Sequence, residues 1–195
     1  RPEESKKKKF KDLVNIDENI FSKNKINIIF TGNIGDAQNF GLVLELIKVT
    51  TDKINWIIAG KGRRYQFLQE EKKKYKLENL KLLGLLKFDD LIEYVRLSDV
   101  LLISLKSGDT FDATIPGKFQ TYLSYKKRII GLIGGEVNSI INKYNIGFAT
   151  NEKDILKIKS QILNYLSKNN NEKEFNKNIE ILKKIYSKKR NIKRL

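Results

Sequence analysis

The sequence of 195 residues contains no cysteine and no histidine. Without cysteine the chain forms no disulfide and carries no thiolate nucleophile. Without histidine it lacks both the commonest general base and the commonest metal ligand, which comes close to excluding a zinc site. We therefore expect a function that does not depend on a thiolate, an imidazole or a zinc ion.

Long hydrophobic runs are also absent. No apolar stretch approaches the roughly 20 residues of a membrane-spanning helix, and no secretory signal peptide is visible. The length favours one domain, or one domain with an appendage, and it suffices for a real hydrophobic core. The chain begins with Arg1 instead of methionine, and we expect it to be a fragment whose preceding part carries some of the function.

Acidic residues are too few to balance the basic ones, since 39 lysines and arginines face 23 aspartates and glutamates, giving a net charge of +16. This charge permits nucleic acid, an anionic membrane surface or a phosphorylated substrate as a partner. The simpler interpretation is that surface lysines are spread over solvated helices. The densest basic runs are "KKKKF" at 6–10 and "SKKRNIKRL" at 187–195. Neither has the interleaved aromatic side chains on which the bases of single-stranded nucleic acid stack.

Six apolar runs alternate along the chain with amphipathic or charged segments. The runs are continuous, which is typical of parallel strands that are covered on both faces by helices. The sequence therefore predicts an α/β fold with a Rossmann-like parallel sheet of about six strands and helices on both faces. The predicted strands are 26–32, 55–60, 80–84, 100–105, 128–133 and 147–150.

The segments between these strands are predicted to be helices. Phe40, Val43, Leu44 and Ile47 follow the i, i+3, i+4, i+7 spacing of one buried helix face, and Asp89 is expected to cap a short helix. Other helices are predicted near 64–76, 118–125 and 138–144, and two more follow the last strand. The predicted organisation is a linker or entry segment at 1–25, a Rossmann-like domain at 26–170 and a carboxyl-terminal helix at 171–195.

The loop after the first predicted strand resembles a phosphate-binding turn, but it fits neither of the two common motifs. A dinucleotide fingerprint would need glycine at position 34, which is Ile34, and an acid after the second strand, where Lys61 stands. A P-loop would need serine or threonine after the Gly117–Lys118 pair, and Phe119 occupies that place. A nicotinamide cofactor and a P-loop nucleotide site are both disfavoured.

A looser group of residues remains at the expected carboxyl ends of the strands, where ligands of such sheets bind. Gly32 and Gly35 would let a phosphate approach the backbone, Arg63 offers a forked guanidinium, and Lys118 begins a helix whose dipole favours an anion. The alternative is that each glycine is an ordinary turn residue and that Arg63 is a solvated charge. The recurrence of glycine and basic residues on successive strand ends favours a diphosphate site.

Five strings give the chain a resemblance to a known family. They are "FTGNIGDAQNF", "IIAGKGRR", "SDVLLISL", "TIPGKFQTYLSYKKRII" and "GGE". In this order and spacing they resemble the carboxyl-terminal half of GT-B glycosyltransferases of family 4, also called group 1. The chain is most similar to the bacterial branch of O-antigen and capsule assembly that includes the L-fucosamine transferases. The resemblance covers nearly the whole chain.

The resemblance implies an enzyme of which this half binds the nucleotide sugar, commonly a UDP-sugar, while a missing amino-terminal half binds the acceptor glycan or lipid-linked sugar. It implies transfer of a hexosyl or N-acetylhexosaminyl group with retention of configuration, no metal and no cofactor, and no activity for this half alone. The expected location is cytoplasmic, with peripheral association at the inner face of the cytoplasmic membrane permitted by the basic surface.

The resemblance also assigns residues. It implies that Gly32, Gly35, Arg63 and Lys118 hold the diphosphate, that Gly62, Leu85 and Thr121 lie at the base and ribose, and that Asp109, Thr110, Phe111, Thr114 and Glu136 lie near the donor sugar. No catalytic residue is assigned. The paired glutamates of many members are replaced here by Ala113 and Thr121, and a basic residue common elsewhere is Gln38.

Two other functions remain open from the sequence. A basic Rossmann-like module could bind nucleic acid, although its charges cluster at the termini and no recognition motif is present. A glycosyltransferase-like domain without the paired glutamates could also be inactive and serve as a scaffold. Under the favoured glycosyltransferase interpretation, nucleic acid is not a partner.

Overall fold

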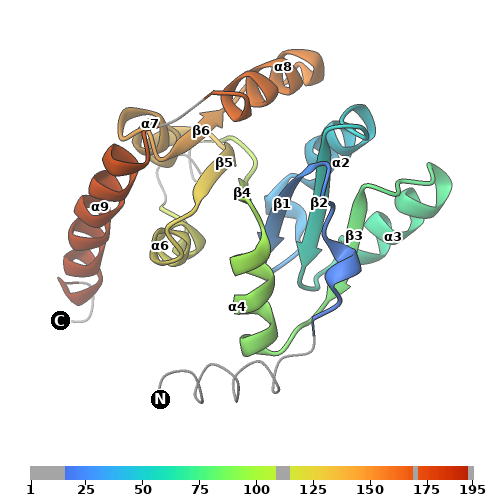
Figure 1. Cartoon of the computed structure of the whole chain (residues 1–195), viewed down its shortest axis with the longest axis horizontal. Coiled ribbons are helices and arrows are strands. Elements are labelled where there is room, and N and C mark those ends of the chain that lie inside the picture. Colours follow the sequence, from blue (N-terminus) through green and yellow to red (C-terminus); the bar gives the residue numbers. More distant parts are fainter. Residues whose placement is uncertain (1–15, 109–114, 169–170, 193–195) are drawn as a thin grey trace.

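A computed structural model describes residues 16–108, 115–168 and 171–192 and shows one parallel sheet with the strand order β3-β2-β1-β4-β5-β6. The predicted α/β class, with about six parallel strands and helices on both faces, is confirmed (Figure 1). The strands are β1 (Ile26–Thr31), β2 (Ile54–Ala59), β3 (Leu80–Gly84), β4 (Val100–Ser104), β5 (Arg128–Leu132) and β6 (Gly147–Thr150).

Helices connect the strands and form a layer on each face of the sheet. One apolar core lies between the sheet and α2, α3 and α8, and a second lies between the sheet and α4, α6, α7 and α9. The elements are η1 (Glu18–Ile20), η2 (Asp36–Gln38), α2 (Phe40–Val49), α3 (Tyr65–Lys74), α4 (Phe88–Leu97), α6 (Gly117–Ser124), α7 (Gly135–Lys143), α8 (Ile155–Leu166) and α9 (Glu172–Ile192).

The central strands are buried on both faces, which explains their continuous apolar sequences. Every residue of β2 and of β4 is buried. Along β1, Ile28 and Phe30 face one core while Ile29 faces the other, because successive side chains of a strand point to opposite faces. Helix α2 buries Phe40 and Val43 as its spacing predicted.

The strand order reverses direction between β1 and β4, which pair through Ile28 with Val100 and Ile29 with Leu101. In open α/β sheets ligands bind at such a switch point, and we call the region at the carboxyl ends of β1 and β4 the crevice. Because all the strands are parallel, the loops after β2, β3 and β5 end at the same edge. The fold therefore brings together the loops that the sequence singled out.

Two predicted helix starts are wrong. Helix α4 begins at Phe88 with Lys87 in the capping position, and Asp89 lies inside the first turn, where its carboxylate still faces the positive end of the helix dipole. Helix α7 begins at Gly135 instead of near 138, because Gly134 and Gly135 allow a sharp turn directly from β5 into the helix.

The ends of the described chain pack against the sheet domain. Ile16 and Ile20 contact the second core, and Phe175, Ile179 and Leu182 of α9 are buried in it. Helix α9 lies beside α6 (Figure 1). The division at 25 and 170 stays a prediction, and most of the proposed linker lies outside the described residues.

The loops after β1 and β2 meet so closely that only glycine fits between them. A Cβ atom on Gly60, whose φ is +146°, would lie 1.9 Å from the carbonyl oxygen of Gly32, and one on Gly62, whose φ is +159°, would lie 2.4 Å from that of Ile34. This contact fixes the first two loops of the edge as one unit.

Substitution of Gly60 by alanine is expected to lower the free energy of unfolding by at least about 2 kcal/mol, because the new methyl group meets backbone atoms that cannot rotate away. Gly41→Ala is the matched control: nothing lies within 4 Å of its Cβ position in α2. That variant should gain about 0.5–1 kcal/mol from helix propensity. Urea unfolding followed by circular dichroism measures both, and equal effects of the two variants would contradict the close contact.

Candidate functional site

Lys118 of α6 reaches across the crevice at the point where the strand order reverses. Its ammonium nitrogen lies 3.2 Å from the centroid of the Phe30 ring. A Cβ atom on Gly32 would lie 3.6 Å from Lys118 Cε and 3.8 Å from Nζ, so the end of the lysine side chain lies directly beside Gly32. The structure thus brings together Gly32 and Lys118, two of the predicted diphosphate ligands that are 86 positions apart.

Tyr122 holds α6 in this place. One helical turn after Lys118, its hydroxyl accepts a hydrogen bond from the amide of Thr31 at 3.0 Å and lies 3.2 Å from the Thr31 hydroxyl. The ring is fully buried, and burial raises the pKa of Tyr122 to about 12, so the phenol stays neutral. Since residues four apart share a helix face, this bond fixes the position of Lys118 as well.

The Lys118 ammonium is mostly withdrawn from water. Burial lowers the pKa of Lys118 from its ordinary value of 10.5 to about 7. Among the residues that the structure describes, no carboxylate forms an ion pair with it; its recorded contact is the Phe30 ring. A cation held in this way gains most from a bound anion, because the anion replaces the solvation that burial removed.

The loop after β1 is fastened to the loops on both sides. The Ile34 amide donates to the carbonyl of Lys61 at 2.9 Å, and the Arg64 amide donates to the carbonyl of Ile34 at 2.9 Å. On the other side the Lys106 amide donates to the carbonyl of Ala37 at 2.8 Å. The Ile34 side chain, which breaks the dinucleotide fingerprint, is fully buried and anchors the turn in the core.

The Gly35 amide already has a partner within the loop. It donates a hydrogen bond to Oε1 of Gln38 at 2.9 Å. An anion that uses this amide, as the resemblance implies, must displace the Gln38 side chain. Gly35 therefore stays a predicted ligand whose donor is occupied in the unliganded loop.

The two arginines after β2 behave differently. Arg63 is exposed at the start of the α3 turn, while Arg64 places Nε 3.1 Å from a carboxylate oxygen of Asp36 and packs its guanidinium 5.1 Å from the Phe67 ring centroid. Arg64 thus links the loops after β1 and β2, whereas Arg63 beside it is exposed to solvent.

The remaining described candidates are spread along the same edge. Leu85, 72% exposed, follows the Gly84 turn after β3. Thr121 is exposed on α6, and its hydroxyl donates to the carbonyl of Gly117 at 3.2 Å. Glu136 lies in the first turn of α7, where its charge adds to burial in raising the pKa of Tyr186 on α9. Glu136 therefore lies toward α9, on the other side of β4 from Arg63.

Four predicted donor-sugar residues fall outside the described part of the chain: Asp109, Thr110, Phe111 and Thr114. Sequence reasoning missed the roles of Tyr122 and Arg64. The signal for Tyr122 was available, because a tyrosine four positions after a candidate ligand lies on the same helix face. The Arg64 pairing with Asp36 depends on two loops meeting in space and has no sequence signature.

Within residues 16–108, 115–168 and 171–192, no three acidic side chains gather into a group that could hold a metal ion. None of the helices in this part of the chain combines the length and the apolar character needed to cross a bilayer. The described site offers a buried ammonium, backbone amides and a helix amino terminus, which is a chemistry suited to binding an anion.

Removal of the Tyr122 hydroxyl is expected to destabilise the domain. Tyr122→Phe leaves the Thr31 amide without its partner, which should cost about 1–3 kcal/mol of unfolding free energy. Tyr125→Phe serves as the control, since its hydroxyl makes no hydrogen bond with a described residue and its loss should change stability by less than about 0.5 kcal/mol. Thermal and urea unfolding of both variants test the anchor, and an unchanged stability for Tyr122→Phe would refute it.

Lys118 is expected to make stability depend on pH. Its pKa is about 7 in the native state and 10.5 ordinarily, so between these values the unfolded chain binds a proton that the native chain does not. Its contribution to stability therefore rises as pH increases from about 7 to 10.5. In Lys118→Met this rise should be absent, and the difference between the two urea-unfolding profiles across that range isolates it. Parallel profiles would show that Lys118 keeps its ordinary pKa.

Comparison with known proteins places this geometry in a family. The family model described as "Glycosyl transferases group 1" matches residues 13–181. A search of curated proteins found no match. The solved structures with similar folds include HepE of Anabaena in complex with UDP, with 11% identity, a TM-score of 0.64, and coverage of 82% of this chain and 44% of that one.

Two further structures are similar at low identity, which shows the fold alone. The pneumococcal O-GlcNAc transferase GtfA, in complex with UDP and GlcNAc, has 12% identity and a TM-score of 0.61 over 82% of this chain and 33% of its own. The C-terminal domain of LpcC from Francisella tularensis has 17% identity and a TM-score of 0.57 over 90% of this chain and 98% of its own.

The chain spans between a third and a half of the length of the larger enzymes that it resembles, and it spans nearly all of the isolated LpcC domain. Its parallel sheet is that of the GT-B glycosyltransferase domains. Because the family model covers most of its residues, this chain belongs to the group 1 glycosyltransferases.

Proposed function

We propose that this chain is the donor-binding half of a retaining, metal-independent glycosyltransferase and that it holds the diphosphate of a UDP-sugar in the crevice between β1 and β4. The observation that carries the proposal is the Lys118 ammonium, which lies beside Gly32 at that crevice, is mostly buried and lacks a described counterion. The bound UDP in HepE and in GtfA supports the choice of nucleotide.

The proposed chemistry is electrostatic. When the bond between the sugar and the diphosphate breaks, negative charge accumulates on the departing phosphate. Lys118 and the amino terminus of α6 would stabilise that charge from one side of the crevice, and Arg63 from the other. The Gly35 amide would join them once Gln38 moves aside. Leu85, Gly62 and Thr121 would border the base and the ribose, and no catalytic residue is assigned.

The finer features of the function are part of the same proposal. The acceptor glycan or lipid-linked sugar would bind an amino-terminal half that this chain does not contain, and this half alone would transfer nothing. We place the reaction in the assembly of surface polysaccharide, in the branch that includes the L-fucosamine transferases. The working site would be cytoplasmic, at the inner face of the membrane, to which the net charge of +16 would be attracted.

The proposal predicts that the chain binds UDP and that two cations contribute. Lys118→Ala and Arg63→Ala should each weaken UDP binding by roughly 1.5–3 kcal/mol, because each removes a charge-assisted contact. The control, Lys173→Ala on the exposed surface of α9, should bind UDP like the parent chain. Calorimetric titration with UDP, GDP, ADP and NAD measures this. Tight NAD binding without a response to UDP would overturn the proposal. Unchanged UDP affinity in both variants would show that UDP binds elsewhere on the chain.

The same titration distinguishes a ligand role for Lys118 from a structural one. A diphosphate beside the ammonium should raise its pKa, so UDP binding above about pH 7 should take up a proton. Calorimetry in two buffers of different ionisation enthalpy should therefore give different apparent enthalpies for the parent chain and equal ones for Lys118→Met. Proton uptake that persists in Lys118→Met would assign it to another group.

A further inference from the structure

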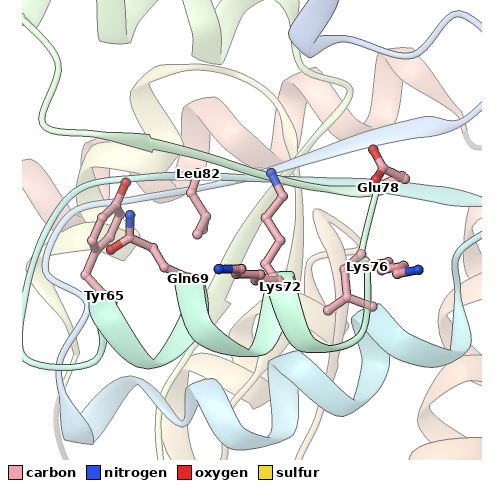
Figure 2. Close-up of a pocket in the computed structure, with 8 residues that line it drawn as sticks. Tyr65, Gln69, Lys72, Lys76, Glu78 and Leu82 are labelled. Atoms are coloured by element: carbon pink, nitrogen blue, oxygen red, sulfur yellow. The ribbon is translucent and has the colours of Figure 1, made fainter.

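A second basic site lies away from the crevice, along the free edge of the sheet. Strand β3 is the outermost strand and pairs only with β2, and α3 runs beside it. Between them is a groove of about 430 Å³. Figure 2 shows Tyr65, Gln69 and Lys72 along the helix, Lys76 just after its end and Leu82 on the strand opposite.

The helix side of the groove presents a row of hydrogen-bond donors. Tyr65, Gln69 and Lys73 are spaced four apart on α3, and Lys72 lies beside Lys73. Lys76 follows in the turn after the helix, where its φ is +51°, and it lines the same groove. At about 1.5 Å per helical residue, the helical part of the row, from Tyr65 to Lys73, extends over roughly 12 Å. A ligand that satisfies the row must offer several acceptors in an extended chain.

The lysines of this segment divide into paired and unpaired ones. Lys74, on the other side of α3, lies 4.0 Å from Glu71, which also receives Lys48 at 3.3 Å. Lys72, Lys73 and Lys76, which line the groove, form no ion pair with any residue between 16 and 192 that the structure describes. Three like charges gathered without neutralisation repel one another, and a bound anion would relieve that repulsion.

The one acid of the groove does not neutralise these cations. Glu78 lines the groove beyond the end of α3, yet it forms no ion pair with Lys72, Lys73 or Lys76. Leu77 and Leu82 supply the apolar part of the groove's lining. Because ammonium groups avoid apolar surface, the lysine side chains keep their charged ends toward water at the mouth of the groove. The arrangement favours a ligand of higher negative charge than one carboxylate.

The groove is separate from the proposed donor crevice. At the end of the groove nearest the carboxyl edge of the sheet, the Tyr65 hydroxyl lies 3.6 Å from the Cβ position of Gly84, the last residue of β3. Tyr65 therefore separates the groove from the loops at that edge. The crevice, by contrast, lies between β1 and β4, with β2 standing between it and the groove. A ligand that spans the row of lysines therefore does not occupy the Lys118 site.

We propose that the groove between α3 and β3 is a second anion-binding site, for an extended ligand that carries two or more phosphate groups. The row of five donors, the three unpaired lysines and the groove together define it. The phosphate groups belong either to a soluble polyphosphate-type molecule or to lipid headgroups. The proposal does not depend on UDP binding at the crevice.

The test is an NMR titration of the full 195-residue chain with tripolyphosphate at low salt, because the amide signals of α3 can be followed separately from those of the loop after β1. The parent chain should show shifts along α3. Lys72→Glu/Lys76→Glu should weaken this binding by at least about tenfold. The matched control, Lys173→Glu/Lys177→Glu, makes the same change at the same spacing on α9, at the opposite end of the molecule (Figure 1), and should bind like the parent.

The outcomes separate the sources of the phosphate and the two proposals. Co-sedimentation with phosphatidylcholine vesicles, with and without phosphatidylglycerol, assigns the phosphate to headgroups if the groove variant alone loses binding to the anionic vesicles. The second site would be overturned if the groove variant bound tripolyphosphate and anionic vesicles as well as the control variant does. NMR shifts confined to α6 and the loop after β1 would overturn it too. A groove variant that still binds UDP shows that the two sites are independent. Failure of the parent chain to bind UDP would overturn only the donor proposal.

Discussion

The hydrogen bond between the Tyr122 hydroxyl and the Thr31 amide is the contact on which the candidate site depends. It joins the last residue of β1 to a helical residue that lies 91 positions later in the chain. Because Lys118 precedes Tyr122 by one turn, the same bond fixes where the lysine enters the crevice. Gly32 completes the arrangement, since its φ of +114° disfavours a side chain and its backbone lies beside the lysine.

The crevice contains a conflict between stability and binding. The buried Lys118 ammonium pairs with no carboxylate in the described part of the chain, so its burial destabilises the native state and lowers the pKa of Lys118 to about 7. A bound diphosphate would reverse that cost. The lysines of the α3 groove differ physically, because they remain in contact with water and their mutual repulsion is screened by salt. Anion binding at the crevice would therefore depend on the desolvation of Lys118, whereas anion binding at the α3 groove would depend on how many lysines face the ligand.

Much of the fold follows from local sequence. Continuous apolar runs such as Ile28–Phe30 predict strands that are covered on both faces, and the spacing from Phe40 to Ile47 predicts a buried helix face. The limits of helices were less predictable. Asp89 resembles a cap, yet α4 starts at Phe88 because Lys87 adopts the extended backbone of the capping position. Such limits depend on where the preceding loop must cross the sheet edge.

The sequence by itself determined the parallel α/β class, the glycines of the loops and the candidate cations Arg63 and Lys118, because these depend on residue type and spacing along the chain. Tertiary structure decided which of them meet. It placed Lys118 beside Gly32, bound Arg64 to Asp36 and set Lys72, Lys73 and Lys76 against the outermost strand, β3. The physical reason is that charge pairing, burial and hydrogen-bond saturation depend on distances between segments that are far apart in the sequence, and those distances exist only after the strands have ordered themselves around β1 and β4.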